Sequence, residues 1–385
     1  MKFIKKISWI LPAIAMTVGA SADDSDISSY CDPCPPKEAP DCDPCYEKSR
    51  NKPYEQGYEI CEGALPKAYN APARIDICDG IDAYVTATFL YWKPMGDQLD
   101  LGVTRTVTDT PDSIKAIKLT TGYEAGFKIG LGTHFSHDDW HLFAQYTRLT
   151  GTHSSSFVPA VDATGQFYTT WFLLDNTAAA REFQFTNIPL GVKGSWKMEL
   201  NKIDLELGRA FYVGTNLITT PFVGVSGHWM DQNYRLTLTD NQTSGGGLFD
   251  AFYKNKSWAF GPRFGLETKW IFYEGFRLFG YGSFALMYSD NDMSGNATEV
   301  DSAYTTTKVE EINLRDVEEL QIGLGWGSYF TSDKWHMDLS VAYEVQRYSH
   351  TNYMSYYSQL ALGGLEVNPA DTYLHGLTVT ARFDF

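Results

Sequence analysis

Residues 123–132 read Tyr-Glu-Ala-Gly-Phe-Lys-Ile-Gly-Leu-Gly, so apolar residues alternate one by one with glycines and charged residues. A period of two predicts a β-strand with one apolar face, because successive side chains of a strand point to opposite sides. The same period returns in 258–270, 335–346 and 376–385, so the strand pattern runs to the end of the 385-residue chain.

Apolar and polar residues would also alternate in the strands of a soluble β-sandwich. The residue composition of the two strand faces distinguishes such a sandwich from a sheet that faces lipid. Here the polar positions are rich in glycine and in charges of both signs, and the apolar positions are aromatic near the strand ends. Eight of the nine tryptophans after residue 22 lie in or beside predicted strands. This pattern is typical of strands that face lipid between two aromatic belts. We therefore predict an all-β protein, a transmembrane antiparallel β-barrel.

The spacing of the segments predicts the number of strands. Ten segments fit: 83–93, 119–135, 139–150, 195–213, 220–231, 256–271, 276–289, 317–330, 335–348 and 372–385. Short turns alternate with long polar loops between them, which is the layout of an outer-membrane barrel, and an even number places both ends on the short-turn side. Twelve strands remain an alternative, because 166–173 and 183–192 in the longest loop could add a hairpin.

One predicted strand, 195–213, changes parity along its length. Its apolar residues occupy even positions up to Leu200 and odd positions from Ile203 onward. A β-bulge near Asn201 and Lys202 would reconcile the two halves. Arg209 would still face lipid, which is acceptable only at a membrane interface.

The first 80 residues differ from the rest. Residues 1–22 have a basic start, a short apolar run and small residues at a cleavage site, which predicts a secretory signal peptide. Residues 23–80 contain no Trp or Phe and cannot build a core of their own. We assign them to a Cys/Pro-rich periplasmic segment and residues 81–385 to the barrel.

That segment holds all six cysteines, namely Cys31, Cys34, Cys42, Cys45, Cys61 and Cys78. An exported chain meets an oxidising compartment, and the two Cys-x-x-Cys pairs lie too close together for the usual zinc-ribbon gap. We therefore expect disulfides and no metal. Six cysteines allow 15 pairings, so the connectivity stays open.

Charge and motifs narrow the function. The chain has 47 acidic and 31 basic residues and a formal charge of -16, which argues against a nucleic-acid partner. Neither the Gly-x-Ser-x-Gly nor the His-Glu-x-x-His motif occurs. We expect no enzyme and no cofactor.

The charged residues on the polar parity are the candidate pore-lining residues: Glu124, Lys128, Asp204, Glu206, Arg263, Glu267, Lys269, Asp338, Glu344 and Arg382. Charges inside a barrel line water or pair across it. A water-filled pore and a self-paired plug are both open at this point, and the glycines on the same parity favour the pore.

Three stretches carry a family resemblance. Residues 82–94 read Asp-Ala-Tyr-Val-Thr-Ala-Thr-Phe-Leu-Tyr-Trp-Lys-Pro, residues 203–213 lead into Pro-Phe-Val-Gly-Val at 221–225, and the chain ends in Arg-Phe-Asp-Phe. Over about 83–385 the chain resembles the Legionella-type pore-forming outer-membrane proteins, which include the major-outer-membrane-protein-like porins of Chlamydia-like bacteria. The resemblance implies a pore in the bacterial outer membrane and brings no catalytic residue.

We therefore expect a channel for passive diffusion of small hydrophilic solutes. The alternatives are a structural, disulfide-linked envelope protein and a surface adhesin that binds through its long loops. The expected partners are outer-membrane lipid, the barrel-assembly machinery and, through disulfides, other envelope proteins or a second copy of the chain.

The first prediction concerns Phe385. The resemblance implies that the assembly machinery recognises a last strand that ends in an aromatic residue. Deletion of Phe385 should therefore lower the amount of protein inserted in the outer membrane, measured by cell fractionation. Normal insertion of the shortened chain would contradict this role.

The second prediction concerns the cysteines. If the segment 23–80 is cross-linked between chains, non-reducing gels should show oligomers that collapse on reduction. Replacing all six cysteines with Ser should abolish the oligomers and leave the heat-modifiable mobility of the barrel unchanged. A monomer on non-reducing gels would restrict the bridges to one chain.

Overall fold

A computed structural model describes residues 73, 75, 77, 80–106, 113–135, 140–158, 165–168, 184–185, 191–213, 215–239, 248–273, 275–299, 302–305, 309–331, 334–354 and 368–385. All of them belong to one compact unit. The predicted signal peptide and the six cysteines lie outside the described residues. No helix among the described residues is long and apolar enough to cross a membrane.

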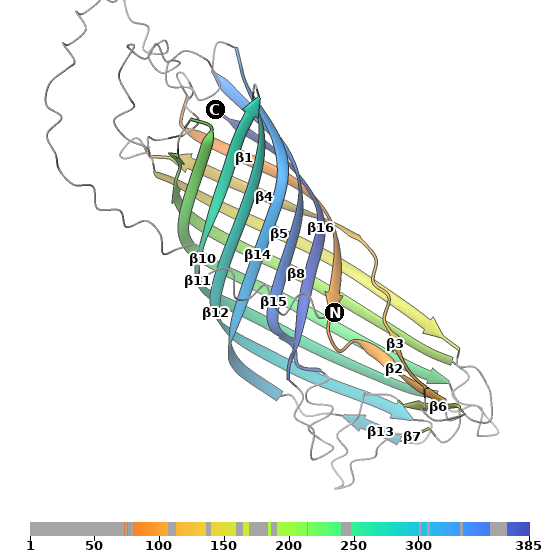
Figure 1. The fold of residues 1–385 in the computed structure, drawn as a ribbon. Helices are drawn as coiled ribbons and strands as arrows, with labels where there is room; N and C mark the ends of the chain where they lie inside the picture. The colour runs from red at the N-terminus through yellow and green to blue at the C-terminus, as the bar shows by residue number, and fades with distance from the viewer. Residues whose placement is uncertain are drawn as a thin grey trace, which may run out of the picture. The chain divides into compact units, whose positions relative to one another are not determined.

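Ten antiparallel strands form a closed barrel (Figure 1). In chain order they are β1 (Ala83–Gly96), β4 (Glu124–His134), β5 (Trp140–Phe157), β8 (Gly191–Arg209), β10 (Leu217–Thr239), β11 (Leu248–Tyr273), β12 (Phe276–Glu299), β14 (Val309–Phe330), β15 (Trp335–Asn352) and β16 (Ala370–Asp384). Neighbours in the chain pair with each other, and β1 closes the barrel against β16. Two short strands flank it: β9 (Phe211–Tyr212) pairs with β10 and β13 (Ser302–Thr305) pairs with β12.

The prediction of ten strands is confirmed, and the twelve-strand alternative is wrong. The extra hairpin exists as β6 (Gly165–Tyr168) and β7 (Gln184–Phe185), but it joins β2 (Asp100–Thr106) and β3 (Ser113–Lys118) in a separate four-stranded sheet. Several barrel strands are longer than expected. Most of the predicted loops 232–255 and 290–316 continue the pairing of β10, β11, β12 and β14.

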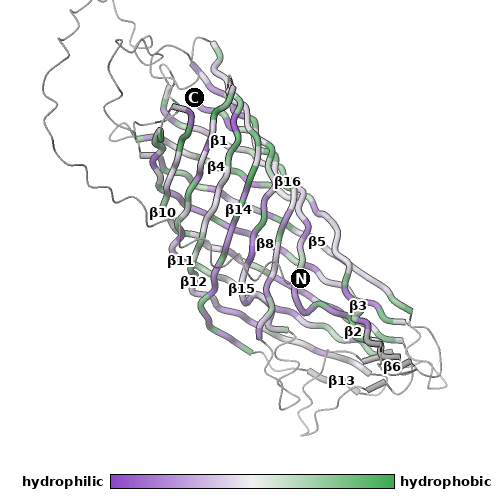
Figure 2. Tube along the Cα trace, viewed as in Figure 1, coloured by the Kyte–Doolittle hydropathy of each residue, from purple (hydrophilic) through white to green (hydrophobic). Residues whose placement is uncertain are grey.

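The long strands change polarity part of the way along, and β10 shows this most clearly. Its outer wall carries Val223 and Trp229, both more than half exposed, and then turns to Asp231 and Arg235. Its lumen side is mixed up to His228 and then becomes apolar. The part of the barrel nearer the short turns thus has an apolar outer wall that faces lipid and polar groups inside. The part nearer the long loops, which we call the upper part, has a polar outer wall and a mainly apolar interior, as a soluble protein has. Figure 2 shows hydrophobic and hydrophilic residues alternating along the barrel strands.

The same change explains the parity shift in β8, and the predicted bulge is wrong. Strand β8 pairs with both β5 and β10 without any shift of register. Leu200 is fully buried and faces the lumen, whereas Ile203 is 48% exposed on the outer wall. The apolar residues therefore change sides because the surroundings change, between Leu200 and Ile203, while the backbone stays regular.

An aromatic ring marks this boundary on the outer wall. We call it the loop-side ring, and its members are Tyr91, Tyr123, Tyr146, Trp229, Trp258, Tyr288 and Tyr343. Several touch across strands: Tyr91 stacks on Tyr123 with ring centroids 5.1 Å apart, and Trp258 lies 5.8 Å from Tyr288. Aromatic rings of this kind sit at the level of lipid headgroups.

A second aromatic ring lies at the short-turn end, with Trp140, Trp270, Phe276, Trp335 and Phe383 exposed on the outer wall. Arg209, the last residue of β8, is at this level, and its guanidinium lies 4.9 Å from the centroid of the Phe211 ring. Its lipid-facing parity is thus accounted for by an interfacial position. Phe385 exchanges two backbone hydrogen bonds with Ala83, which joins the end of the chain to β1.

The boundary predicts that one substitution has unequal effects at two positions on the same face of β5. Ala144 lies on the outer wall below the loop-side ring and Ser154 above it. Ala144→Arg should cost about 2–4 kcal/mol of barrel stability, the expected cost of Arg on a lipid face, whereas Ser154→Arg should cost almost nothing. Folding into lipid vesicles along a urea titration, followed by heat-modifiable gel mobility, measures both. Equal losses for the two variants would contradict the boundary.

Candidate functional site

The lumen between the two aromatic rings is lined with charged and polar side chains. All ten residues predicted to line it lie on the lumen face of their strands. Lys128, Asp204, Arg263, Asp338 and Glu344 are buried, and the other five are partly buried.

Four charged side chains meet in the middle of the lumen, two of them predicted, and we call them the central cluster: Lys202, Asp204, Arg263 and Glu319. Arg263 Nη1 lies 2.5 Å from Asp204 Oδ1, and its Nη2 lies 2.8 Å from Glu319 Oε2. Lys202 contacts both Asp204, at 3.0 Å, and Glu319. These residues come from β8, β11 and β14, which are not neighbours in the barrel, so the cluster spans the bore.

A second bridge joins β4 to β15. Lys128 Nζ lies 2.7 Å from Glu344 Oε1, and Thr378 Oγ1 donates a hydrogen bond of 3.0 Å to Glu344 Oε2. The ammonium also lies 4.9 Å from the centroid of the Trp92 ring, within range of a cation–π contact. Strands β1 and β16 separate β4 from β15, so this pair also crosses part of the lumen.

Further pairs fill the short-turn end, namely Lys269–Glu267 at 2.8 Å, Arg277–Asp338 at 2.5 Å and Arg382–Asp384 at 2.5 Å. The Arg382 guanidinium lies 3.6 Å from the centroid of the Tyr84 ring. His336 Nδ1 lies 3.0 Å from Asp384 Oδ2. Each of these lumen cations therefore has a carboxylate partner.

Five lumen charges were missed from the sequence: Lys202, Arg277, Arg315, Glu319 and Asp384. Lys202 was not assigned to the lumen because a bulge was predicted at its position. Regular alternation, counted back two residues from Asp204, would have placed it on the lumen face. With these five, eight acidic and seven basic side chains of the described residues face the lumen between the rings.

Above the loop-side ring the barrel interior is mainly apolar, with a few buried neutral polar side chains such as Gln232 and Asn255. Trp196, Met198, Leu200, Met230 and Tyr234 are all fully buried there, in a cluster that continues through the other long strands. The described lumen is therefore filled at two levels, by paired charges below and by apolar side chains above.

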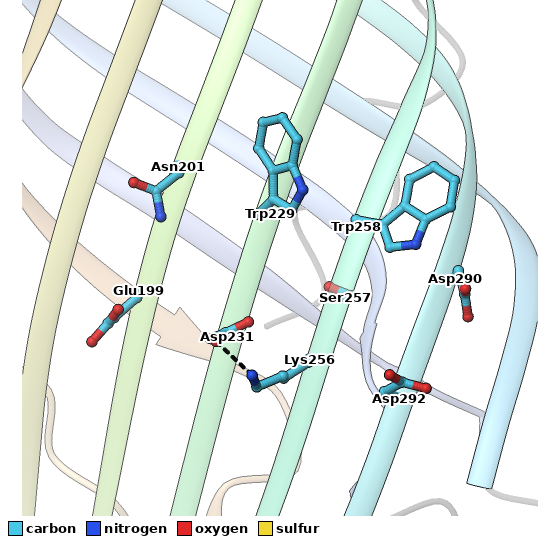
Figure 3. A pocket seen from close by; sticks show the side chains of 9 residues that line it. All are labelled: Glu199, Asn201, Trp229, Asp231, Lys256, Ser257, Trp258, Asp290 and Asp292. Atoms are coloured by element: carbon cyan, nitrogen blue, oxygen red, sulfur yellow. Dashed lines mark ion pairs between the residues drawn. The ribbon is translucent and has the colours of Figure 1, made fainter.

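A hollow on the outer wall is separate from the lumen (Figure 3). Its floor is formed by β8, β10, β11 and β12 at the loop-side ring, and Trp229 and Trp258 lie beside a set of charged groups that includes Glu199, Asp290 and Asp292. Lys256 Nζ lies 4.0 Å from Asp231 Oδ2. The hollow thus belongs to the level at which the outer wall changes from apolar to polar. Among the described residues no group of His, Cys, Asp and Glu side chains is placed to hold a metal ion.

Comparison with solved structures found distant resemblances. The outer membrane protease OmpT from Escherichia coli has 11% identity and a TM-score of 0.39, over 84% of this chain and 99% of that one. A TodX deltaS2S3 mutant, described as a monoaromatic hydrocarbon channel, has 8% identity and a TM-score of 0.25, over 80% of this chain and 90% of that one. Scores this low carry no argument about activity.

Comparison with curated proteins found no match. The model of one family matches residues 79–385, which include the whole barrel, and its description is "Legionella pneumophila major outer membrane protein precursor". The resemblance seen in the sequence is thereby confirmed, as is the location in the outer membrane. The chain belongs to the Legionella major outer membrane protein family.

Proposed function

We propose that the protein is a narrow channel for passive diffusion of small hydrophilic solutes, closed at rest by ion pairs that cross its lumen. Transport of this kind needs no catalytic residue and no cofactor. The ten predicted lumen residues then act together with Lys202 and Glu319 as the walls and the constriction of the path.

The observation that carries this proposal is where the chain places its charges. Buried ion pairs stabilise a fold weakly, and apolar side chains of similar volume often do better. The chain fills its interior with apolar side chains above the loop-side ring, yet between the rings it uses the central cluster and the Lys128–Glu344 pair. Because these buried ion pairs add little to the stability of the fold, their presence in the lumen favours a role in the passage of polar solutes.

A structural role in the envelope is the second candidate, and the apolar interior above the loop-side ring favours it. Leu236, Leu238, Phe249 and Ala251 are almost fully buried in this part of the barrel. A continuous core of this kind stiffens the barrel and leaves no wide polar route. The two candidates differ in whether purified protein conducts ions.

The lumen charges also bear on ion preference. The ten lumen residues predicted from the sequence are six acidic and four basic, a small acidic excess that favours weak cation selectivity. The eight acidic and seven basic side chains now placed between the rings reduce this excess. We expect a slight cation preference that fades as the screening length falls from about 30 Å at 0.01 M salt to about 10 Å at 0.1 M.

Single-channel recording in planar bilayers tests the proposal. Lys128→Ala with Glu344→Ala removes both partners of a lumen pair and leaves the net charge unchanged, so mean conductance should rise above that of the wild type. Arg235→Ala with Asp250→Ala is the matched control, since this 2.7 Å pair lies on the outer wall. The control should conduct like the wild type.

Absence of conductance from both the wild type and the lumen variant, at every voltage tested, would contradict the channel and support the structural role. Reversal potentials across a salt gradient measure ion preference in the same recordings. A clear anion preference at low salt would show that the net lumen charge does not set selectivity.

A further inference from the structure

Arg315 differs from the other cations of the lumen. It lies on the lumen face of β14, where the charged zone meets the apolar interior, and it is fully buried. Six other lumen cations have a carboxylate within 4.0 Å, namely Lys128, Lys202, Arg263, Lys269, Arg277 and Arg382. Among the described residues, no carboxylate lies that close to Arg315.

The hydrogen bonds of Arg315 all go to neutral acceptors. Its Nη1 lies 2.9 Å from His228 Nε2 and 3.4 Å from Ser257 Oγ. Its Nη2 donates to Asn291 Oδ1 at 2.8 Å and to the His350 carbonyl at 2.9 Å. These contacts hold the guanidinium in place but do not neutralise its charge.

Two N–H groups at this place are left without an acceptor. A guanidinium can only donate, so His228 Nε2 must accept, and in the neutral ring the proton then sits on Nδ1. Both His228 Nδ1 and Arg315 Nε are buried and make no hydrogen bond. The unsatisfied groups of the two side chains are therefore donors, which is what a negatively charged ligand requires.

We infer that Arg315, held in place by His228, is a binding site for a small carboxylate anion inside the barrel. A buried cation without a counter-ion is strongly unfavourable, and a carboxylate accepts from guanidinium N–H groups in good geometry. The residue paired with Arg315 on β12 is Met287, and Met230 on β10 is paired with Ser257, a hydrogen-bond partner of Arg315. Methionine side chains are pliable, so they can move to admit a ligand of a few atoms.

Equilibrium dialysis of radiolabelled acetate against the folded barrel in neutral detergent tests this site. Wild-type protein should bind acetate saturably at one site per barrel. Excess formate should displace it, whereas neutral acetamide should not. Absence of saturable binding, or displacement by acetamide as well, would overturn the inference with wild-type protein alone.

Two variants locate the site. Arg315→Met removes the charge at similar length and should weaken acetate binding by about tenfold or more, as expected for loss of a charged hydrogen bond. Arg347→Met is the matched control, because Arg347 lies on the outer wall with its Nη2 3.0 Å from Asp371 Oδ2, and it should bind like the wild type. Heat-modifiable mobility verifies that both variants are folded.

Unchanged acetate binding by the Arg315→Met variant would place the anion elsewhere and refute the site. Dialysis measures equilibrium binding and requires no conduction. A closed, non-conducting barrel that binds acetate at Arg315 would therefore refute the proposed channel and leave this site standing.

Discussion

The structure depends on one constraint: the outer wall of the barrel meets lipid over part of its height and water over the rest. A side chain on that wall must be apolar in the first zone and is free to be polar in the second. Successive residues of a strand point alternately to the outer wall and to the lumen. The interior is therefore polar where the outer wall is apolar, and mainly apolar where the outer wall is polar. The loop-side ring, with Trp229 and Trp258 among its members, marks where the exchange takes place.

This constraint also explains how the interior is filled. Between the rings the apolar residues are used on the lipid face, and the interior holds ion pairs such as Lys202 with Glu319. Above the ring the apolar residues return to the interior and build a conventional core around Trp196 and Tyr234. Arg315 lies where the two interiors meet, which is why it is buried among neutral groups, away from the carboxylates.

Alternation and the rhythm of short and long connections were enough to predict the ten strands, because both follow directly from the geometry of a barrel in a membrane. The lengths of the strands were underestimated, since polar residues such as Arg235 look like loop residues when the outer wall is assumed to be apolar throughout. Because of the same assumption, the shift of the apolar residues from even to odd positions after Leu200 was interpreted as a bulge, and Lys202 was not predicted to face the lumen. Parity shows which residues face the lumen, but the partner of each charge depends on barrel closure, which brings distant strands together.

The most direct test is to locate the boundary between lipid and water along one strand, β8. Spin labels at Lys197, Glu199, Ile203 and Leu205, all on the outer wall of β8, would be examined in lipid vesicles for accessibility to oxygen and to a water-soluble nickel complex. Labels at Ile203 and Leu205 should be accessible mainly to oxygen, and labels at Lys197 and Glu199 mainly to nickel. The same accessibility at all four positions would contradict a membrane boundary between Glu199 and Ile203.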